Sequence, residues 1–325
     1  MKPEDKTLRI CAVVVAAALI LRLSTGALPQ KITAFFCQSQ VASALVFAQT
    51  GRVLLFPEDT EATQIPSTQP SPVTEKEAVT FSIQDTQLVQ INNASSYTLD
   101  PDKLLQAPLD WELTGSEPTV LILHSHGSES YRGSCDNETT YRTLEESKNM
   151  LAVGQQVASL LEQAGIRVIH DRTIHDYPSY NGAYNHSRTQ TNEYLQQYPS
   201  IRLVLDLHRD AMEDGNGKQI STTVTIDGKS SAQLMMVVGS SAGGLNHPNW
   251  QENMALAMKL HAQLEKIYPG ICRPISFRSQ RFNQDLSTGA MLIEVGAAGN
   301  TLAEALTAAD CLAQAIISLS HGTSQ

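Results

Sequence analysis

The 325-residue sequence lacks both closely spaced cysteines and an excess of basic residues. Its five cysteines, at positions 11, 37, 135, 272 and 311, form no CxxC pair, and the first lies inside an apolar run. This spacing argues against a disulfide framework and against a metal site built from cysteine thiolates. The formal net charge is −10 with no basic run to offset it, whereas nucleic-acid-binding domains normally carry a basic patch. The sequence therefore excludes a typical nucleic-acid-binding protein.

Long hydrophobic runs are also scarce, and the clearest one lies at the N-terminus. Three basic residues precede an apolar run from Ile10 to Leu21. Its twelve residues fall short of the roughly 20 of a complete span and suit the core of a signal peptide. The cleavage pattern that follows is poor, however, and a snorkelling Arg22 would let the span continue through Leu23. We therefore expect residues 1–30 to be an uncleaved membrane anchor, with a cleaved signal peptide as the alternative and the body of the protein outside the cytoplasm.

Two further segments separate this anchor from the folded part of the chain. Residues 31–56 are moderately apolar but interrupted by glutamines, which favours a juxtamembrane helix over a second span. Residues 57–77 contain four prolines and many Thr and Ser residues, a composition typical of a flexible linker. From residue 78 the chain becomes globular. We expect a small lead-in β element over 78–118 and a catalytic domain over 119–320.

Strand-like apolar runs alternate with helical periods through the catalytic region. Strands are expected over 119–124, 166–170, 201–207, 233–238 and 290–295, and helices over 145–164, 189–198, 250–268 and 302–319. This alternation predicts an α/β fold with a mostly parallel, twisted sheet and helices on both faces.

Three of these strands end in the side chains that a zinc hydrolase needs. His124 and His126 follow the first strand, His208 ends the strand at 201–207, and Glu294 lies in the last. Reacting groups in open α/β sheets lie outside the carboxyl ends of the strands. Two neutral imidazoles and a carboxylate from separate strands can hold Zn²⁺ and leave one position open for water. The pattern therefore predicts a zinc site at this edge of the sheet.

The first strand and the loop after it offer several candidate zinc ligands, and their positions in the sequence differ. His126 stands before Gly127, where the chain turns, and active-site residues concentrate in such loops. His124 is then interpreted as a buried structural histidine. Glu129 lies in the same loop, while Glu146 opens the following helix, where an acidic residue also simply favours the helix dipole. The residues by themselves leave the carboxylate ligand open.

His208 and Glu294 have different surroundings in the sequence. His208 is flanked by Asp206 and Asp210, either of which can orient its imidazole. The alternative for His208 is a surface charge cluster with Arg209. Glu294 interrupts an apolar strand, and a buried carboxylate is costly unless it is paired or protonated. Burial raises a carboxyl pKa and suits a general base, and the alternative is a salt bridge to a nearby arginine.

A serine-hydrolase motif competes with this zinc site. The segment Gly239 to Gly243 matches G-x-S-x-G with Ser241 at its centre, and acidic residues and His321 follow in the order of a catalytic triad. The motif requires a helix directly after the serine, whereas the amphipathic helix here begins only near Asn249. The serine-hydrolase interpretation is therefore the weaker alternative.

Several motifs taken together resemble the stage II sporulation protein P family, whose catalytic domain is similar to the zinc-dependent N-acetylmuramoyl-L-alanine amidases. They are the segments 124–131, 166–171, 175–181, 205–210 and 291–296. The resemblance covers about residues 80–320 and extends to the N-terminal membrane segment and variable linker. It implies an amidase-like fold and a membrane-anchored hydrolase that cleaves the amide between muramic acid and L-alanine in peptidoglycan, and also peptide cross-bridges. The implied partners are the sporulation proteins D and M during engulfment, between the engulfing membranes.

The resemblance also implies a role for individual residues. It places the zinc histidines on His126 and His208 and the catalytic glutamate on Glu294. Alignment of the helix at 151–161 implies Glu146 as the third ligand. The amidases' Gly-rich sequence after the first histidine is missing, and Ser128-Glu129-Ser130 stands there instead, which leaves Glu129 as the alternative ligand or a second acid. The residues expected to contact the glycopeptide are Arg209, Asn181 and Tyr184.

The implied mechanism is zinc-assisted amide hydrolysis with Glu294 as the group that moves the proton. The non-enzymatic alternative is a peptidoglycan-binding scaffold that keeps the fold without a metal.

Overall fold

A computed structural model of the chain describes residues 78–109 and 111–324. The expected anchor, juxtamembrane segment and linker, residues 1–77, lie outside the described residues. Among the described helices, none has the length and apolar character needed to cross a membrane.

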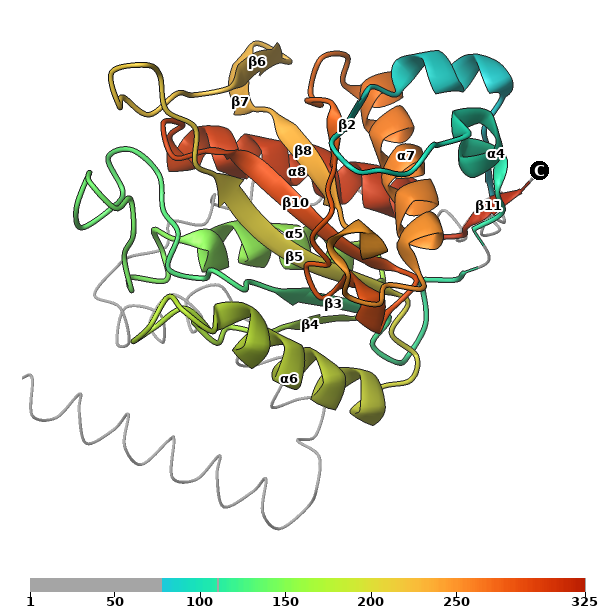
Figure 1. Ribbon diagram of the computed structural model, residues 1–325, viewed down its shortest axis with the longest axis horizontal. Coiled ribbons are helices and arrows are strands. Elements are labelled where there is room, and N and C mark those ends of the chain that lie inside the picture. The colour runs from blue at the N-terminus through green and yellow to red at the C-terminus, as the bar shows by residue number, and fades with distance from the viewer. Residues whose placement is uncertain (1–77, 110, 325) are drawn as a thin grey trace, which may run out of the picture. The chain divides into compact units, whose positions relative to one another are not determined.

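Seven strands form the central sheet in the order β2-β9-β8-β10-β5-β3-β4 (Figure 1). All neighbours in this sheet run parallel except β8 and β10, which are antiparallel. This arrangement agrees with the mostly parallel sheet expected from the sequence. The strands are β2 (Ile91–Asn93), β3 (Val120–Leu123), β4 (Val168–His170), β5 (Leu203–Asp210), β8 (Leu234–Val238), β9 (Ile275–Phe277) and β10 (Ala290–Ala297).

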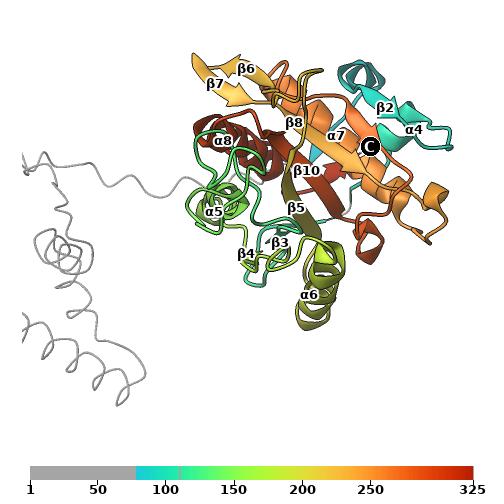
Figure 2. The same ribbon diagram turned by 60° about the vertical axis from the view of Figure 1, so that its left-hand side comes forward.

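Helices cover both faces of this sheet, because successive side chains of its strands point to opposite faces. In β3, Val120 and Ile122 belong to the main core with α5, α7 and α8, whereas Leu121 and Leu123 pack with residues of α6. Figure 2 shows α6 separated from α5 and α8 by the strands. The helices are α4 (Pro101–Gln106), α5 (Met150–Gln163), α6 (Ala183–Gln197), α7 (Trp250–Ile267) and α8 (Leu302–Ser318).

Capping side chains explain where two of these helices begin. The side chain of Asn149 accepts a hydrogen bond from the Leu151 backbone at 3.0 Å, so α5 begins at Met150, five residues later than expected at 145. Thr301 and Glu304 form a reciprocal capping box at the start of α8, which satisfies backbone donors that have no partner within the helix. The late start of α5 leaves Glu146 in the preceding loop.

The remaining elements lie around the sheet. Residues 78–118, expected as a lead-in element, contribute β2 to the edge of the central sheet and β1 to a parallel pair with β11. The strands β6 and β7 form an antiparallel hairpin. These elements are β1 (Val79–Thr80), β6 (Thr223–Ile226), β7 (Lys229–Ala232), β11 (Thr323–Ser324) and the 3-10 helices η1 (Ile83–Leu88), η2 (Ser241–Gly243) and η3 (Gln284–Leu286).

Candidate active site

The order of strands in the sheet brings three of the expected site residues together. Strand β5 lies between β3 and β10, and Glu294 is the register partner of His208. The imidazole rings of His126 and His208 lie with their centroids 5.3 Å apart and nearly perpendicular. Both histidines are buried. The edge of the sheet formed by β3, β5 and β10 therefore carries two imidazoles and a carboxyl group.

The carboxylate that joins these histidines is Glu129. Its backbone N–H donates to the His126 carbonyl at 3.2 Å, and this turn directs the side chain back toward the sheet. Glu129 Oε2 lies 3.6 Å from His208 Nδ1 and accepts a hydrogen bond from the Arg209 backbone. Burial opposes ionisation of Glu129, but His208 and Arg209 outweigh it and lower the carboxyl pKa. Glu129 is therefore a buried anion beside the histidines.

Glu146, the ligand expected from the resemblance, lies elsewhere. Its side chain is half exposed and forms an ion pair with Arg172. The expectation placed Glu146 at the start of a helix, whereas α5 begins only at Met150. The structure therefore places Glu146 in a surface ion pair and Glu129 beside His208.

Asp206 contacts His208 on the side of the ring opposite Glu129. Asp206 Oδ1 lies 2.9 Å from His208 Nε2, and its carboxylate accepts hydrogen bonds from the backbone N–H and hydroxyl of Ser125. Burial raises the pKa of Asp206, but the charge of His208 and these hydrogen bonds lower it to about 2. Asp210 instead pairs with Arg273 at 2.8 Å. Of the two aspartates expected to orient His208, Asp206 is thus the one in contact.

Asp176 plays the corresponding part for His126, and sequence reasoning missed it. Its Oδ2 lies 3.8 Å from His126 Nδ1, and it accepts hydrogen bonds from the Ser128 backbone and hydroxyl and from Arg142. Burial opposes its ionisation, but His126, Ser128 and Arg142 lower the pKa to about 2. Asp176 lies in the loop that follows the edge strand β4. The sequence feature that could have revealed it is an acidic residue beyond the carboxyl end of another parallel strand.

The surroundings of Glu294 differ from those of the other carboxylates. Its Oε2 is shielded from solvent and has no hydrogen-bond partner. Burial raises its pKa to about 8, with His208 opposing and Glu129 reinforcing the shift. The expected alternative, a salt bridge to an arginine, does not occur within residues 78–109 and 111–324, where Arg281 pairs with Asp285 instead.

The carboxylates around His208 favour its protonated form. Burial opposes its protonation, but the Asp206 carboxylate, and more weakly the Glu129 carboxylate at 3.6 Å, raise the His208 pKa well above its usual value. A histidine binds a metal through its neutral imidazole, so metal binding at His208 would release this proton.

The donor atoms at this edge have the chemistry of a zinc site, although they are not gathered around one point. No cluster of three or more His, Cys, Asp or Glu side chains stands ready to hold a metal ion in the described part of the chain. His126 Nδ1 and Glu294 Oε2 are nevertheless buried without hydrogen-bond partners, whereas His208 Nε2 lies 2.9 Å from Asp206 Oδ1. Buried polar atoms are normally paired, so each of the two unpaired atoms calls for an absent partner. Two imidazoles with one carboxylate form a donor set that zinc accepts.

His124 lies behind this group and is fully buried. Its Nδ1 lies 3.0 Å from the Leu207 carbonyl, and its Nε2 lies 3.0 Å from His170 Nε2. Burial lowers the His124 pKa to about 4. The ring is therefore a neutral link between β3, β4 and β5, as in the structural interpretation of the sequence.

An aromatic wall closes one side of the site. Tyr180 stacks on the His126 ring at a centroid distance of 4.4 Å, and Tyr184 lies edge-on to the same ring at 5.4 Å. A cavity of about 260 Å³ is lined by His126, both tyrosines and Asn181 among others. The expected contact residues Asn181 and Tyr184 therefore line a cavity beside His126. Arg209 does not: its buried guanidinium binds the backbone carbonyls of Ser130 and Tyr141.

The residues of the serine-hydrolase alternative do not assemble. Ser241 lies in η2, where its hydroxyl accepts a hydrogen bond from the His247 backbone. His321 pairs with Glu112, and Asp285 pairs with Arg188. Because the proposed nucleophile, base and acid each contact other residues, no triad forms at Ser241.

Comparison with known proteins gives a family match and several more distant structural matches. The family model described as Stage II sporulation protein P matches residues 38–317. Stage II sporulation protein P of Bacillus subtilis (strain 168) is 30% identical over 278 residues, which cover 80% of this chain and 64% of that protein. The chain thus spans less than two thirds of the length of this relative.

Two solved structures illustrate the structural matches. The N-acetylmuramoyl-L-alanine amidase AmiC2 of Nostoc punctiforme is 15% identical with a TM-score of 0.38, covering 63% of this chain and 97% of that one. The CwlD amidase from Clostridioides difficile, solved in complex with the GerS lipoprotein, is 14% identical with a TM-score of 0.38, covering 62% and 95%.

Proposed function

The chain belongs to the Stage II sporulation protein P family, and from this we propose that it is a zinc-dependent peptidoglycan hydrolase. Its substrate is the amide between the lactyl group of N-acetylmuramic acid and L-alanine. The observation that carries this proposal is the convergence of His126, Glu129, His208 and Glu294 at one edge of the sheet, where His126 Nδ1 and Glu294 Oε2 are buried without hydrogen-bond partners.

In this proposal His126, Glu129 and His208 hold the zinc ion. When bound there, zinc lowers the pKa of a coordinated water toward about 7 and polarises the scissile carbonyl. Asp206 and Asp176 keep the two imidazoles in place, since each contacts its histidine and is itself fixed by a serine. Carboxylates that orient ligating histidines in this way are a regular part of zinc sites.

Glu294 moves the proton in the proposed reaction. Its unpaired Oε2 accepts a proton from the attacking water and later returns it to the nitrogen of the leaving L-alanine. Burial holds this carboxyl at a raised pKa of about 8, so the protonated form needed for the second transfer is within reach near neutral pH. The absence of an arginine partner at Glu294 Oε2 in the described residues leaves this oxygen available.

The cavity beside His126 is proposed to receive the bond that is cleaved. Tyr180 and Tyr184 form its aromatic wall, and Asn181 supplies an amide group at its rim. The Tyr180 ring stacks on His126 and lies under the Arg142 guanidinium at 4.6 Å, but the residue is 55% exposed, so the exposed part of its ring can contact the sugar.

The location of the protein is part of the same proposal. We propose that residues 1–30 anchor the chain in the membrane and that the catalytic domain lies between the engulfing membranes of a sporulating cell. The sporulation proteins D and M are the proposed partners, and cleavage of peptide cross-bridges is a proposed second activity.

The test is digestion of purified cell-wall sacculi by the full-length chain, with and without a chelator, combined with metal analysis of the protein. Amidase action releases peptides with new L-alanine N-termini, whereas cross-bridge cleavage exposes other amino groups. We expect bound zinc and chelator-sensitive release of L-alanine termini, and no release by Glu294→Gln. A metal-free chain that binds sacculi and releases nothing would instead be a scaffold.

A further inference from the structure

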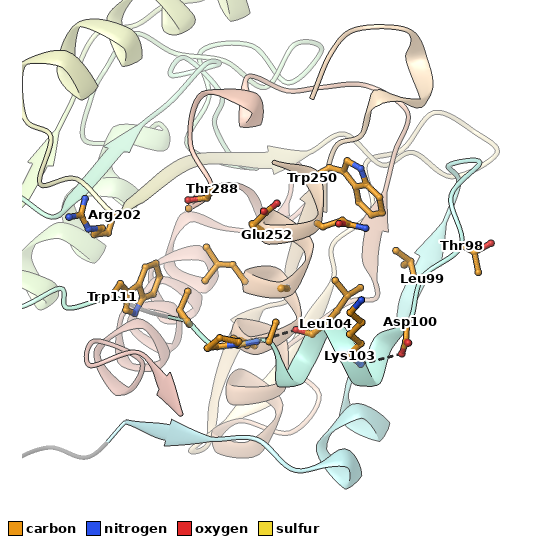
Figure 3. A pocket seen from close by; sticks show the side chains of 18 residues that line it. Thr98, Leu99, Asp100, Lys103, Leu104, Trp111, Arg202, Trp250, Glu252 and Thr288 are labelled. Atoms are coloured by element: carbon orange, nitrogen blue, oxygen red, sulfur yellow. Dashed lines mark hydrogen bonds between the residues drawn. The ribbon is translucent and has the colours of Figure 1, made fainter. Parts of the chain in front are cut away.

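A second cleft lies at the opposite edge of the sheet from the candidate active site. Its volume is about 540 Å³, and it is lined by the segment 98–111, the first turns of α7 and the residues just before two central strands (Figure 3). Arg202 precedes β5 and Gly289 precedes β10, whereas His208 and Glu294 lie farther along these strands. Six residues of strand from Arg202 to His208 span about 20 Å. The cleft is thus separate from the catalytic edge.

Both tryptophans of the chain, Trp111 and Trp250, line this cleft. Trp111 is held in place by a hydrogen bond of 2.8 Å from its indole Nε1 to the Leu319 carbonyl. Trp250 stacks with Tyr97 at 4.8 Å and with Phe277 at 5.4 Å. Figure 3 shows the two indoles in different parts of the lining. The aromatic part of the lining is therefore fixed before any ligand arrives.

The charged side chains of the lining nearly cancel. Lys259 is buried, and its ammonium group donates hydrogen bonds to the carbonyls of Leu104 and Leu105, so it is already used in the wall. Two cations and two carboxylates remain, which are Arg202, Lys103, Asp100 and Glu252. Charge complementarity thus favours neither a polyanion nor a polycation and favours a ligand that is itself nearly neutral.

We propose that this cleft binds a saccharide segment of the peptidoglycan glycan strand, apart from the bond that is cleaved. A pyranose ring has apolar C–H faces that pack on aromatic rings, and hydroxyl and acetamido groups that need planar hydrogen-bonding partners. Trp111 supplies a ring, and Trp250, which is stacked with Tyr97 and Phe277, supplies the part of its indole that lines the cleft. Arg202 and Glu252 supply the planar polar groups. The volume falls within the range of about 300–1,000 Å³ typical of ligand pockets.

A peptide ligand fits these observations less well. Extended peptides usually dock on an exposed strand edge, and helical peptides dock in an apolar groove. The described lining comes from helix turns, connecting segments and the starts of interior strands β5 and β10, which already pair on both sides. Its charged groups would also remain unpaired beneath an apolar helix face.

The test uses the fluorescence of the full-length chain, because its only two tryptophans both line the cleft. Glycan strands stripped of their peptides are titrated against the protein, so that no amide bond is available for cleavage. We expect a saturable fluorescence change, with affinity reduced about tenfold in Arg202→Ala and in Glu252→Ala. The matched control is Arg167→Ala, which removes an exposed arginine just before β4 and outside the cleft, and it should bind as the unchanged chain does.

The choice of a glycan rests on the proposed function, but the binding test does not require hydrolysis. Glu294→Gln should keep full affinity for the stripped strands while releasing nothing from sacculi. If the unchanged chain also binds the strands but releases nothing from sacculi, the proposed function is contradicted and the cleft assignment stays intact. Three results would overturn the assignment: no saturable change, equal affinity in the two cleft variants and the control, or a saturable change with free stem peptides instead of glycan. Thermal unfolding of each variant checks that the fold is retained.

Discussion

At the scale of single residues, the candidate site is a set of histidines and carboxylates in alternating contact. Asp176 lies against His126, Asp206 lies against His208, and Glu129 lies near His208 from the other side. Each of the three carboxylates has a pKa below its usual value despite burial, because cations and hydrogen-bond donors surround it. Glu294 has no such partners, and its pKa moves in the opposite direction. The site therefore holds three fixed anions and one carboxyl group able to exchange a proton.

The identity of the carboxylate ligand leads to a paired prediction. Glu129→Gln should weaken zinc binding by more than the about 10–100-fold that is typical of outer-shell partners, because it removes a charged ligand. Glu146→Gln is the matched control and should leave zinc affinity unchanged, since Glu146 pairs with Arg172 at the surface. Competition with a chromogenic chelator measures both affinities. Loss of zinc in Glu146→Gln with retention in Glu129→Gln would reverse the assignment.

Asp176 should strengthen zinc binding indirectly, through its contact with His126. Asp176→Asn keeps an acceptor for Ser128 but removes the negative charge near His126 Nδ1. We expect zinc affinity to fall about 10–100-fold. Asp102→Asn, at an exposed position in α4, serves as the control for loss of one carboxylate. Equal zinc affinities in these two variants, measured by calorimetric titration, would argue against a role for Asp176 at the metal.

The raised pKa of Glu294 predicts how the metal-free protein responds to pH. The folded chain keeps this carboxyl protonated up to a pKa of about 8, whereas the ordinary value is 4.5. Between these values the folded state binds more protons, so the contribution of Glu294 to stability is full below about 4.5 and is lost as the pH rises through about 8.

Urea unfolding with a chelator present, at about pH 5 and about pH 9, measures this effect. The chain should lose more stability between the two values than Glu294→Gln does, because glutamine does not titrate. Comparison of the two chains cancels the contribution of His208, whose pKa is also raised. Equal pH dependence in both chains would show that Glu294 has an ordinary pKa.

At the scale of elements, the close approach of α5 to the sheet holds the histidines behind the site. Gly154 of α5 faces the rings of His124 and His170, where an added Cβ atom would come within 2.5 and 2.6 Å of their Nε2 atoms. The two rings also lie 3.0 Å from each other. His124 is fully buried, so its ring has no free space into which to move. Glycine at this position therefore allows helix and sheet to meet.

Gly154→Ala should consequently destabilise the protein, although alanine is the better helix former. Overpacking of this kind costs about 1–3 kcal/mol, which outweighs the gain of about 1 kcal/mol in helix propensity. Gln163→Ala, at an exposed position of the same helix, should change stability by less than about 0.5 kcal/mol. Chemical denaturation measures both, and a Gly154→Ala chain as stable as the control would contradict the predicted clash.

At the scale of the whole molecule, the sheet separates two sites. The carboxyl ends of β3 and β5 carry the histidines, and the cleft with both tryptophans lies at the starts of β5 and β10. In the two proposals taken together, one edge of the sheet cleaves the amide that joins the stem peptide to the glycan, and the other edge binds the glycan strand. A large polymeric substrate can contact both edges, whereas a small fragment cannot.

The membrane anchor proposed for residues 1–30 would determine where the whole molecule is found in the cell. The full-length chain should sediment with membranes, and deletion of residues 1–30 should release it into the soluble fraction. The proposed zinc ligands and Glu294 all lie beyond residue 119, so the shortened chain should still digest isolated sacculi in solution. Release of the full-length chain by high salt alone would indicate a peripheral contact in place of an anchor.

Much of the fold follows from local pattern, because apolar periodicity and strand alternation depend on neighbours along the chain. The strands from β3 to β5, the strand β10 and the helices α7 and α8 lie within a few residues of their expected positions. The hairpin of β6 and β7 was missed although its turn residues, Asp227 and Gly228, have positive φ and form a recognisable hairpin signal. Strand β9 is only three residues long, too short for a periodic pattern.

The sequence by itself determined the residue types and their places at strand ends, which was enough to expect His126, His208 and Glu294 at one edge. Tertiary structure decided which carboxylates join them. Glu129 reaches His208 because a turn folds the loop back, Glu146 stays at the surface because α5 starts late, and Asp176 arrives from the loop after β4. Contacts of this kind depend on loop paths and on the order of strands across the sheet. Neither leaves a periodic signal in the sequence, because the residues involved are brought together only by long-range packing.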